Sequence, residues 1–445
     1  MYIHIIFVLL MVGVVRSLPS QCSWLAGEKC VKSALSMSRR YLSASLATCN
    51  DGSSAGYYIR REKESKLWIV YLEGGWFCFN ERTCMQRFNH SSIYSMTSSK
   101  LWPKLRQGDG LLNVHAKHNP QFHKANHVYV PYCSSDFWIG NTTQTTSKGV
   151  KIGFQGAHII MEVIKDLLKN GLKDSSRLFF VGSSAGGIGV LQNIDRIANF
   201  LKRKKLNIDV RGMIDSSWFV DNGISTNCAS SNVYECHPQL MFKQAASYWN
   251  AVVDHSCGKK HVEKHKCLFA LNAIEHINTP IFVFQWIHDT AQILADNKDL
   301  ELDPKKIFSY KYKQYVKKLG ETLRTSLKDI NSKHGIFAAS CISHTALATS
   351  ESLNKIKIEG NTLNDALYCW LANNKRNHRS SAPCKQRLID TCKHPHCHGN
   401  CPVVRNPMTG EKIIMKTPSS GKKLPFDMAK MDLDLINRLL TEFKG

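Results

Sequence analysis

The turn from Gly182 to Gly187 carries the residue pattern with the clearest chemical meaning in this chain. It reads Gly-Ser-Ser-Ala-Gly-Gly and contains Gly-x-Ser-x-Gly, with Ser184 at the central position. An apolar run, 178–181, ends just before it, and a helix-like pattern begins just after it. A sharp turn between a strand and a helix presents a serine hydroxyl above a sheet, and its glycines avoid collisions that a Cβ would cause. The pattern predicts Ser184 as the nucleophile of a serine hydrolase.

The sequence of this turn suggests two other interpretations. A phosphate-binding loop needs Lys followed by Ser or Thr after its last glycine, whereas Ile188 follows Gly187 here, so that interpretation is excluded. A purely structural strand-to-helix turn remains open on the pattern alone. Ser183 competes with Ser184 by residue type, but it occupies a variable position of the pattern, and its side chain is expected to point away from the site.

A serine nucleophile needs a histidine that takes its proton and a carboxylate that orients the histidine. In α/β-hydrolases the acid follows the serine in the chain and stands just after a strand. Asp289 meets this condition after the apolar run 281–287, and Asp215 meets it after the run 210–214. Spacing alone leaves both aspartates open as the acid.

The histidine is expected later in the chain, in a loop. His344 follows the apolar piece 336–339, and we expect a disulfide at Cys341 to tether it. His288 is a poor partner for Asp289 because the side chains of consecutive residues diverge. The oxyanion hole needs two backbone N–H groups. We expect one from Ala185 and the other from the loop at Gly75 and Trp76.

The elements around these residues predict an α/β fold. Continuous apolar runs separated by amphipathic helices are typical of a mostly parallel sheet with helices on both faces. We therefore expect an α/β-hydrolase-like, disulfide-stabilised domain over 18–404, followed by a basic tail, 405–445, in which 428–443 can form a terminal helix. The expected strands are 67–72, 128–130, 178–181, 210–214 and 281–284, and the expected helices are 159–168 and 190–201.

The chain has the marks of an exported protein. Residues 1–17 predict a signal peptide, since their apolar run is too short for a membrane span; a signal anchor is the alternative. All 16 cysteines lie beyond it, which predicts up to eight disulfides in an oxidising compartment. Asn89 and Asn141 head N-glycosylation sequons. No later segment has 18 uninterrupted apolar residues, so we expect a secreted protein without a membrane span.

Charge and histidine content suggest partners more weakly. Lys and Arg outnumber Asp and Glu by 59 to 35, a formal net charge of +24. Outside the cell such charge favours sulfated glycans such as heparan sulfate, and the sequence contains no nucleic-acid-binding motif. His394, His396 and His398 lie among cysteines in a spacing that suggests zinc, but in an exported chain disulfides are favoured, so no metal and no cofactor is expected.

Four segments together resemble a known family: 72–80, 131–136, 182–187 and 341–344. They are similar, in the same order, to the Notum family of secreted palmitoleoyl-protein carboxylesterases, relatives of the plant pectin acetylesterases. The resemblance implies hydrolysis of the palmitoleate ester of Wnt proteins, inhibition of Wnt signalling, and association with glypican heparan sulfate.

The resemblance also carries residue roles to this chain. It implies the triad Ser184, Asp289 and His344, and so favours Asp289 over Asp215. It places the oxyanion donors at Gly75 or Trp76 and at Ala185. The acyl-pocket positions that it implies are Trp76, Phe77, Phe219, Pro238, Phe242, Phe269 and Ala291.

The chain departs from the family pattern near these residues. Asp289 lies in the segment His288-Asp289-Thr290-Ala291-Gln292, where the family usually has an aromatic residue before the aspartate and an acidic residue after it. Phe77 stands where a tyrosine is usual, and Phe242 where a smaller aliphatic residue is usual. These changes leave acyl-chain preference open. Two competing functions remain: a pectin-type polysaccharide acetylesterase, which needs a small open acyl site, and a non-catalytic glycan-binding protein of the same fold.

Overall fold

The computed structural model describes residues 35–89, 96–222, 238–296, 310–347, 349–372, 385–392, 395 and 400–402. The predicted signal peptide, 1–17, and the predicted basic tail, 405–445, lie outside these residues. Within the described ranges, no helix is both long enough and apolar enough to cross a membrane.

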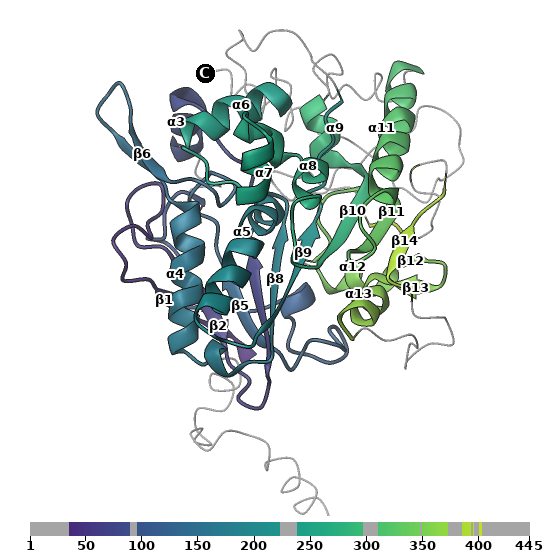
Figure 1. Cartoon of the computed structure of the whole chain (residues 1–445), viewed down its shortest axis with the longest axis horizontal. Coiled ribbons are helices and arrows are strands. Elements are labelled where there is room, and N and C mark those ends of the chain that lie inside the picture. The colour runs from purple at the N-terminus through teal and green to yellow at the C-terminus, as the bar shows by residue number, and fades with distance from the viewer. Residues whose placement is uncertain are drawn as a thin grey trace, which may run out of the picture.

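One large sheet forms the centre of the described structure (Figure 1). Its strand order is β14-β11-β10-β9-β8-β3-β5-β2-β1-β4. The seven strands from β14 to β5 are parallel, and β2, β1 and β4 continue the sheet in antiparallel pairs. The predicted mostly parallel sheet is therefore confirmed. The strands are β1 (Met37–Tyr41), β2 (Gly56–Arg60), β3 (Leu67–Leu72), β4 (Leu105–Arg106), β5 (Asn126–Val130), β8 (Arg177–Ser183), β9 (Asp209–Asp215), β10 (Ile281–Asp289), β11 (Gly335–Ser343) and β14 (Arg387–Ile389).

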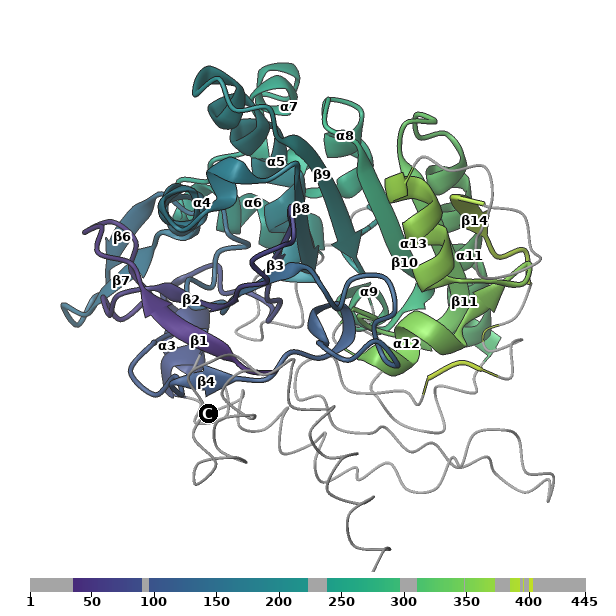
Figure 2. The same cartoon turned by 90° about the horizontal axis from the view of Figure 1, so that it is seen from below.

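Helices cover both faces of this sheet. On β9, a Cβ at Gly212 would lie 2.5 Å from Ile194 of α5, while the neighbouring Arg211 lies over the ring of Trp370 of α13. Because successive strand residues point to opposite faces, α5 and α13 cover opposite sides. Figure 2 shows α4 and α5 together on one side of the sheet and α12 on the other. The helices are α3 (Glu81–Asn89), α4 (Gly156–Lys169), α5 (Ala185–Arg203), α6 (Pro238–Tyr248), α7 (His255–Lys260), α8 (Ala270–Ile274), α9 (Thr290–Asp296), α11 (Tyr310–Lys328), α12 (Ser350–Lys355) and α13 (Leu363–Ala372), with 3₁₀ turns η4 (Gly110–Leu112), η5 (Leu172–Asp174) and η7 (Lys264–Leu268).

Strand β3 is apolar along its whole length, as expected of a strand that is covered on both faces. In β3, Trp68, Ile69 and Val70 are consecutive and all buried. Such strands lack the alternation of a half-exposed sheet. Two short hairpins stand apart from the large sheet: β6 (Thr142–Thr145) with β7 (Lys151–Phe154), and β12 (Lys357–Ile358) with β13 (Asn361–Thr362).

The strand order reverses between β3 and β8. The chain runs from β3 outward to β5, returns to β8 on the other side of β3, and then adds β9, β10 and β11 in order. In open α/β sheets, ligand sites lie beyond the carboxyl ends of the strands at such a switch point. The loop after β3 and the turn after β8 meet there, at the edge from which α9 leaves β10 (Figure 1).

Disulfides cross-link the described structure over both long and short stretches of chain. The pair Cys341–Cys401 links residues 60 positions apart and anchors the end of β11, as expected from the sequence. Among the described residues no cysteine is free. The other described pairs are Cys49–Cys133, Cys78–Cys84 and Cys257–Cys267.

The close contact between α5 and the loop after β3 generates a stability prediction. A Cβ at Gly186 would lie 2.2 Å from the carbonyl oxygen of Leu72 and 2.9 Å from that of Glu73. Both atoms belong to the backbone, so relief requires α5 to move off the sheet. We expect Gly186→Ala to lower the free energy of unfolding by roughly 3 kcal/mol, the upper part of the usual range for overpacking, as measured by urea unfolding.

Gly258→Ala is the matched control. Gly258 is also helical, but its added Cβ would meet only the side chain of Val253, at 3.1 Å. Alanine is favoured over glycine in helices, so this variant should unfold at or above the wild-type denaturant concentration. Equal stability of Gly186→Ala and wild type would contradict the packing argument.

Candidate active site

Ser184 lies in the sharp turn between β8 and α5. Its backbone has φ 54° and ψ −122°, a conformation that non-glycine residues rarely adopt. The turn is held by the Ser184 amide, which donates to the carbonyl of Asp215 at 2.7 Å, and by the Ser217 hydroxyl, which donates to the Ser184 carbonyl at 2.7 Å. The residue keeps 6% of its surface exposed. This is the geometry expected of a serine presented above a sheet.

Small residues are required on every side of this turn. A Cβ at Gly182 would lie 2.2 Å from the carbonyl oxygen of Gly186. A Cβ at Gly187 would lie 1.9 Å from the Ser217 hydroxyl. A Cβ at Gly74 would lie 2.9 Å from the Ser184 Cβ. The loop after β3 therefore passes directly beside the serine, as a loop that supplies an oxyanion donor must.

Asp289 and His344 form a buried pair. The Nδ1–H group of His344 donates to Asp289 at 2.9 Å from Oδ2 and 3.1 Å from Oδ1. The side chain of His344 is 6% exposed and that of Asp289 is 1% exposed. Oδ1 of Asp289 also accepts from the amides of Ala291 and Gln292 in the first turn of α9. With the proton of Nδ1 held by a fixed carboxylate, Nε2 is left as the basic nitrogen of the ring.

The pair determines the protonation of His344. Burial acts to lower the pKa of the imidazole, but attraction to the Asp289 carboxylate and the hydrogen bond to it outweigh burial. The more distant charge of Asp215 acts in the same direction. The pKa of His344 is therefore raised above its ordinary value of 6.5.

Asp215, the other candidate acid, makes a different set of contacts. Its carboxylate accepts from the Ser183 hydroxyl at 2.5 Å and from the amides of Ala346 and Leu347 at 3.0 and 3.1 Å. Ser216 donates to it at 2.9 Å. Burial raises the pKa of this carboxyl group. Within the described residues Asp289 is the carboxylate hydrogen-bonded to the His344 ring, while Asp215 holds the loop that follows it.

Four adjacent strands bring these groups to one edge of the sheet. Ser184 follows β8, Asp215 ends β9, Asp289 ends β10 and His344 follows β11. In the described part of the chain, no hydrogen bond joins the Ser184 hydroxyl to His344 Nε2. Such contacts are commonly long without substrate and shorten when substrate binds. The arrangement suits proton transfer between a hydroxyl and an imidazole.

The loop after β3 offers backbone donors beside the serine. Gly75 has φ 144° and Trp76 has φ 59°, so the backbone turns sharply at this point. The loop is fastened by the Trp138 indole, which donates to the Glu73 carbonyl at 3.0 Å, and by the Cys78 amide, which donates to the Ser135 carbonyl at 3.2 Å. The amides of Trp76 and Ala185 have no acceptor among the described residues. Free, fixed N–H groups are what an oxyanion hole requires.

Most of the predicted acyl-pocket residues belong to one aromatic cluster. The ring of Phe77 lies 5.1 Å from that of Trp76 and 5.9 Å from that of Phe242, between centroids. Phe242 in turn contacts Phe269 at 5.1 Å and Phe219 at 6.4 Å. Pro238 begins α6, the helix that carries Phe242, and Ala291 lies beside Asp289 in α9. Through Trp76 the cluster includes the loop whose Gly74 lies directly beside Ser184.

Sequence reasoning missed Phe79, Phe137 and Trp249, whose rings all pack against Phe77. Phe137 lies 4.3 Å from Phe77, the shortest ring distance in the cluster, and Trp249 lies 5.7 Å from Phe77. Phe137 has φ 53°, in a loop held by the buried carboxylate of Asp136. Burial raises the pKa of Asp136 to about 6. The segment 131–136 was noticed for its resemblance, but no local pattern indicates that the next residue faces Phe77.

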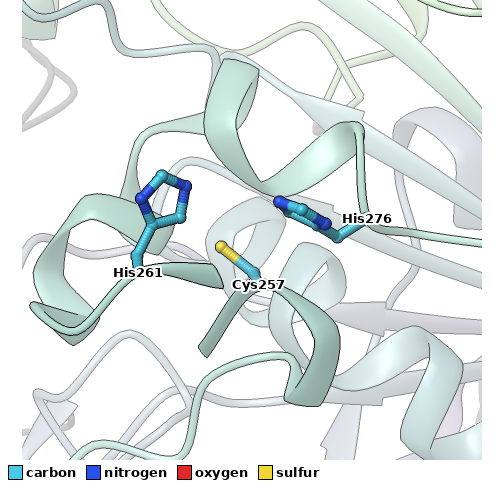
Figure 3. Close-up of side chains that lie close together, drawn as sticks. All are labelled: Cys257, His261 and His276. Atoms are coloured by element: carbon cyan, nitrogen blue, oxygen red, sulfur yellow. The ribbon is translucent and has the colours of Figure 1, made fainter. Parts of the chain in front are cut away.

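A group of potential metal ligands lies on a different part of the molecule. Ligand atoms of Cys257, His261 and His276 lie within 4.8 Å of one another (Figure 3). Cys257 is joined to Cys267 in a disulfide, so its sulfur is no thiolate and does not bind a cation as one. Two imidazoles remain, fewer than the three or four ligands of ordinary zinc sites. His394, His396 and His398, the zinc candidates of the sequence, lie outside the described residues.

The assembled groups match the needs of acyl transfer from an ester. The reaction needs a nucleophilic hydroxyl, an oriented base and two amide donors for a tetrahedral oxyanion. Ser184, the pair of His344 with Asp289, and the amides of Trp76 and Ala185 have these properties. The aromatic cluster adds an apolar surface on the side of the oxyanion loop.

Comparisons with known proteins agree with this chemistry. A family model described as Pectinacetylesterase matches residues 31–402. Palmitoleoyl-protein carboxylesterase notum1a of Danio rerio is 37% identical over 403 residues, which is 89% of this chain and 78% of the relative. Palmitoleoyl-protein carboxylesterase NOTUM of Homo sapiens is 37% identical over 373 residues, 82% of this chain and 73% of the relative.

A solved structure shares the fold. The crystal structure of the Wnt deacylase Notum from Drosophila is 36% identical in sequence, with a TM-score of 0.73. The match covers 82% of this chain and 100% of that chain. The family match, residues 31–402, includes every strand of the large sheet and every side chain assembled above.

The His344–Asp289 pair predicts a particular pH profile. With His344 as general base, only the neutral imidazole accepts a proton, so kcat/KM should fall as the pH drops through the pKa of His344. Because that pKa is raised, the midpoint of the acid limb should lie above 6.5. In Asp289→Asn the carboxylate charge is lost, so the limb should move to lower pH and the maximal rate should fall by about 10⁴. Hydrolysis of a p-nitrophenyl ester between pH 5 and 9 measures both.

Asp254→Asn is the control for this profile. Asp254 caps α7 by accepting from the amides of Ser256 and Cys257, a role that asparagine also fills. Its profile should match that of wild type. An acid limb that stays in place in Asp289→Asn would remove Asp289 from its position as the partner of the base.

Proposed function

The chain belongs to the pectinacetylesterase family, and within this family we propose that it is a secreted serine carboxylesterase that removes the palmitoleoyl group from Wnt proteins and so inhibits Wnt signalling. The observation that carries the proposal is the Asp289–His344 pair at the sheet edge where the strained Ser184 stands. The aromatic cluster beside Ser184 supports a lipid acyl group. The relatives named palmitoleoyl-protein carboxylesterase support the substrate class.

The proposed reaction has two halves. The Ser184 oxygen attacks the ester carbonyl carbon while His344 Nε2 takes the hydroxyl proton, and the amides of Trp76 and Ala185 bind the resulting oxyanion. Collapse breaks the bond to the Wnt serine oxygen, which leaves with the proton from His344. Water then attacks the acyl-serine ester with His344 again as base. The second tetrahedral adduct collapses, the fatty acid leaves, and His344 returns the proton to the Ser184 oxygen.

In the proposed site the acyl chain lies against the aromatic cluster. Trp76 and Phe77 form its wall at the oxyanion loop, and Phe219, Phe242 and Phe269 form the deeper part, with Pro238 and Ala291 at its margin. These rings are apolar and largely buried, as an acyl site requires. A polysaccharide acetylesterase, the alternative function, needs no such surface. Phe242 stands where the family has a smaller aliphatic residue, so in this proposal its larger ring would leave less space for the far end of a chain.

We further propose that the protein acts outside the cell. The predicted signal peptide, 1–17, and the described disulfides support export. Asn89 and Asn141 are both exposed, as glycosylation requires. His158 donates to the Asn141 side-chain oxygen at 2.6 Å, a bond that does not use the amide nitrogen to which a glycan attaches. The basic charge supports binding to heparan sulfate.

Acyl-chain length separates the deacylase from the acetylesterase. We expect p-nitrophenyl octanoate to be hydrolysed with a higher kcat/KM than the acetate. The reason is that burial of each added methylene contributes about 0.8 kcal/mol of binding free energy. A peptide carrying a palmitoleoylated serine should lose its acyl group, which mass spectrometry detects. Good turnover of acetate without turnover of octanoate or of the lipidated peptide would refute the deacylase.

Two variants sharpen this assay. Ser184→Ala should lose hydrolysis of every ester by several orders of magnitude, since the nucleophile is removed. Phe242→Leu should move the preferred chain length upward without abolishing turnover of octanoate. If the optimum stays unchanged in Phe242→Leu, the acyl chain does not reach α6.

Heparin retention tests the glycan proposal. Lys202, Lys204 and Lys205 are exposed at the C-terminal end of α5, away from Ser184 at its N-terminal end. We expect the protein to bind heparin at low ionic strength and to elute as salt screens the charges. Lys202→Gln with Lys204→Gln should elute at lower salt with an unchanged esterase rate. Retention that is insensitive to salt would contradict electrostatic binding.

A further inference from the structure

Arg87 is a buried cation outside every motif noted in the sequence. It lies on α3 and is 4% exposed. Burying a guanidinium group is unfavourable unless its donors are satisfied, so its partners indicate what it does. These partners belong to the loops that surround Ser184.

Contacts with two loops hold Arg87 in place, and its Nη group also lies 3.6 Å from Met96 Sδ. An Nη group donates to the carbonyl oxygen of Gly75 at 2.5 Å, and Nε donates to the Ser135 hydroxyl at 2.8 Å. The guanidinium carbon lies 6.0 Å from the ring centroid of Tyr132. The side chain thus joins the oxyanion loop to the segment that precedes Phe137.

The contact with Gly75 determines the direction of a neighbouring N–H group. The Gly75 carbonyl and the Trp76 amide belong to one planar trans peptide, in which C=O and N–H point in opposite directions. With the carbonyl held toward Arg87, the Trp76 N–H points away from α3. That N–H has no acceptor among the described residues.

The orientation of the Gly75–Trp76 peptide must be fixed by contacts with other residues, because Gly75 itself does not restrict it. Glycine is free to rotate, and Gly75 has φ 144°. Met96 and Tyr132 pack against Gly75 so closely that a Cβ would lie 2.6 Å from Met96 Sδ and 3.2 Å from Tyr132 Cδ1. The helix that carries Arg87 is joined to the same loop by the Cys78–Cys84 disulfide, which keeps the arginine in register with the carbonyl.

We propose that Arg87 is a positioning residue that holds the Gly75–Trp76 peptide in the orientation in which the Trp76 N–H binds the oxyanion. The proposal rests on the function proposed above, because it gives this N–H its role. Arg87 touches no reacting atom. It acts by preventing the peptide from turning over, which would replace a donor by a carbonyl oxygen facing the developing negative charge.

Steady-state kinetics on p-nitrophenyl octanoate test the proposal. In Arg87→Met the kcat should fall about 10²- to 10³-fold, the usual effect of losing one oxyanion donor, while KM changes by no more than roughly threefold. Inhibition by an acyl trifluoromethyl ketone, which forms a tetrahedral adduct, should weaken in parallel. Arg87→Lys, which reaches one acceptor instead of two, should give an intermediate kcat.

Rescue distinguishes positioning from general loss of structure. Guanidinium chloride at low millimolar concentration should raise the kcat of Arg87→Ala toward the wild-type value and leave wild type unchanged. Arg387→Met is the matched control: Arg387 also donates to backbone carbonyls, those of Asn331 and His334, at the other end of β11. It should lower the melting temperature without lowering kcat.

The outcomes separate the two proposals. If wild type hydrolyses no ester, the proposed function fails. If wild type is active and folded Arg87→Met retains its kcat, Arg87 has no positioning role. The same conclusion follows if kcat in the Arg87 variants falls only in proportion to the folded fraction measured by circular dichroism, with no rescue by guanidinium.

Discussion

The buried carboxylate of Asp215 joins the two halves of the site. Asp215 ends β9, which lies between β8 and β10 in the sheet. Its oxygens accept from the Ser183 hydroxyl on one side and from the amides of Ala346 and Leu347 on the other. The histidine loop is therefore fastened to the nucleophile turn by hydrogen bonds that a low-dielectric interior strengthens. Sequence spacing left both Asp215 and Asp289 open as the acid. In the structure Asp289 orients the His344 ring, and Asp215 orients the backbone of the loop that carries this histidine.

Backbone strain is concentrated at the same edge of the sheet. Trp76, Ser184, Ser216 and Thr345 all have positive φ and stand in the loops that follow β3, β8, β9 and β11. Such conformations cost of order 1–3 kcal/mol each and persist only where surrounding contacts fix them. Here the contacts are visible: the Ser216 hydroxyl accepts from the Thr345 amide at 2.9 Å, so two of the strained turns hold each other. The regular part of the sheet thus stabilises turns that would not form alone.

The sequence predicted what depends on continuous apolar runs and missed what depends on contacts between loops. The strand 67–72 was predicted with the bounds of β3, because its residues are apolar and its ends are polar. The strand predicted at 281–284 extends to Asp289, since Gln285 is buried and its side chain accepts from the Trp218 amide. Phe137 and Arg87 were not found, because an aromatic residue in a loop and an arginine on a polar helix have no local pattern. The antiparallel strands β1, β2 and β4 were also missed; β1 and β4 are mostly exposed and have no continuous apolar run.

The oxyanion loop and the aromatic cluster share residues, and this has a consequence for catalysis in the proposed reaction. Trp76 supplies a donor through its backbone and a ring to the cluster, and its neighbour Phe77 contacts Phe137 and Phe242. An acyl chain lying against these rings would therefore press on the loop that carries the donor. Binding energy from the chain can then be used at the reacting carbonyl, so that a longer chain raises kcat as well as lowering KM. For an acyl group too small to reach Phe77, the orientation of the Trp76 amide would depend on the hydrogen bonds of the loop alone.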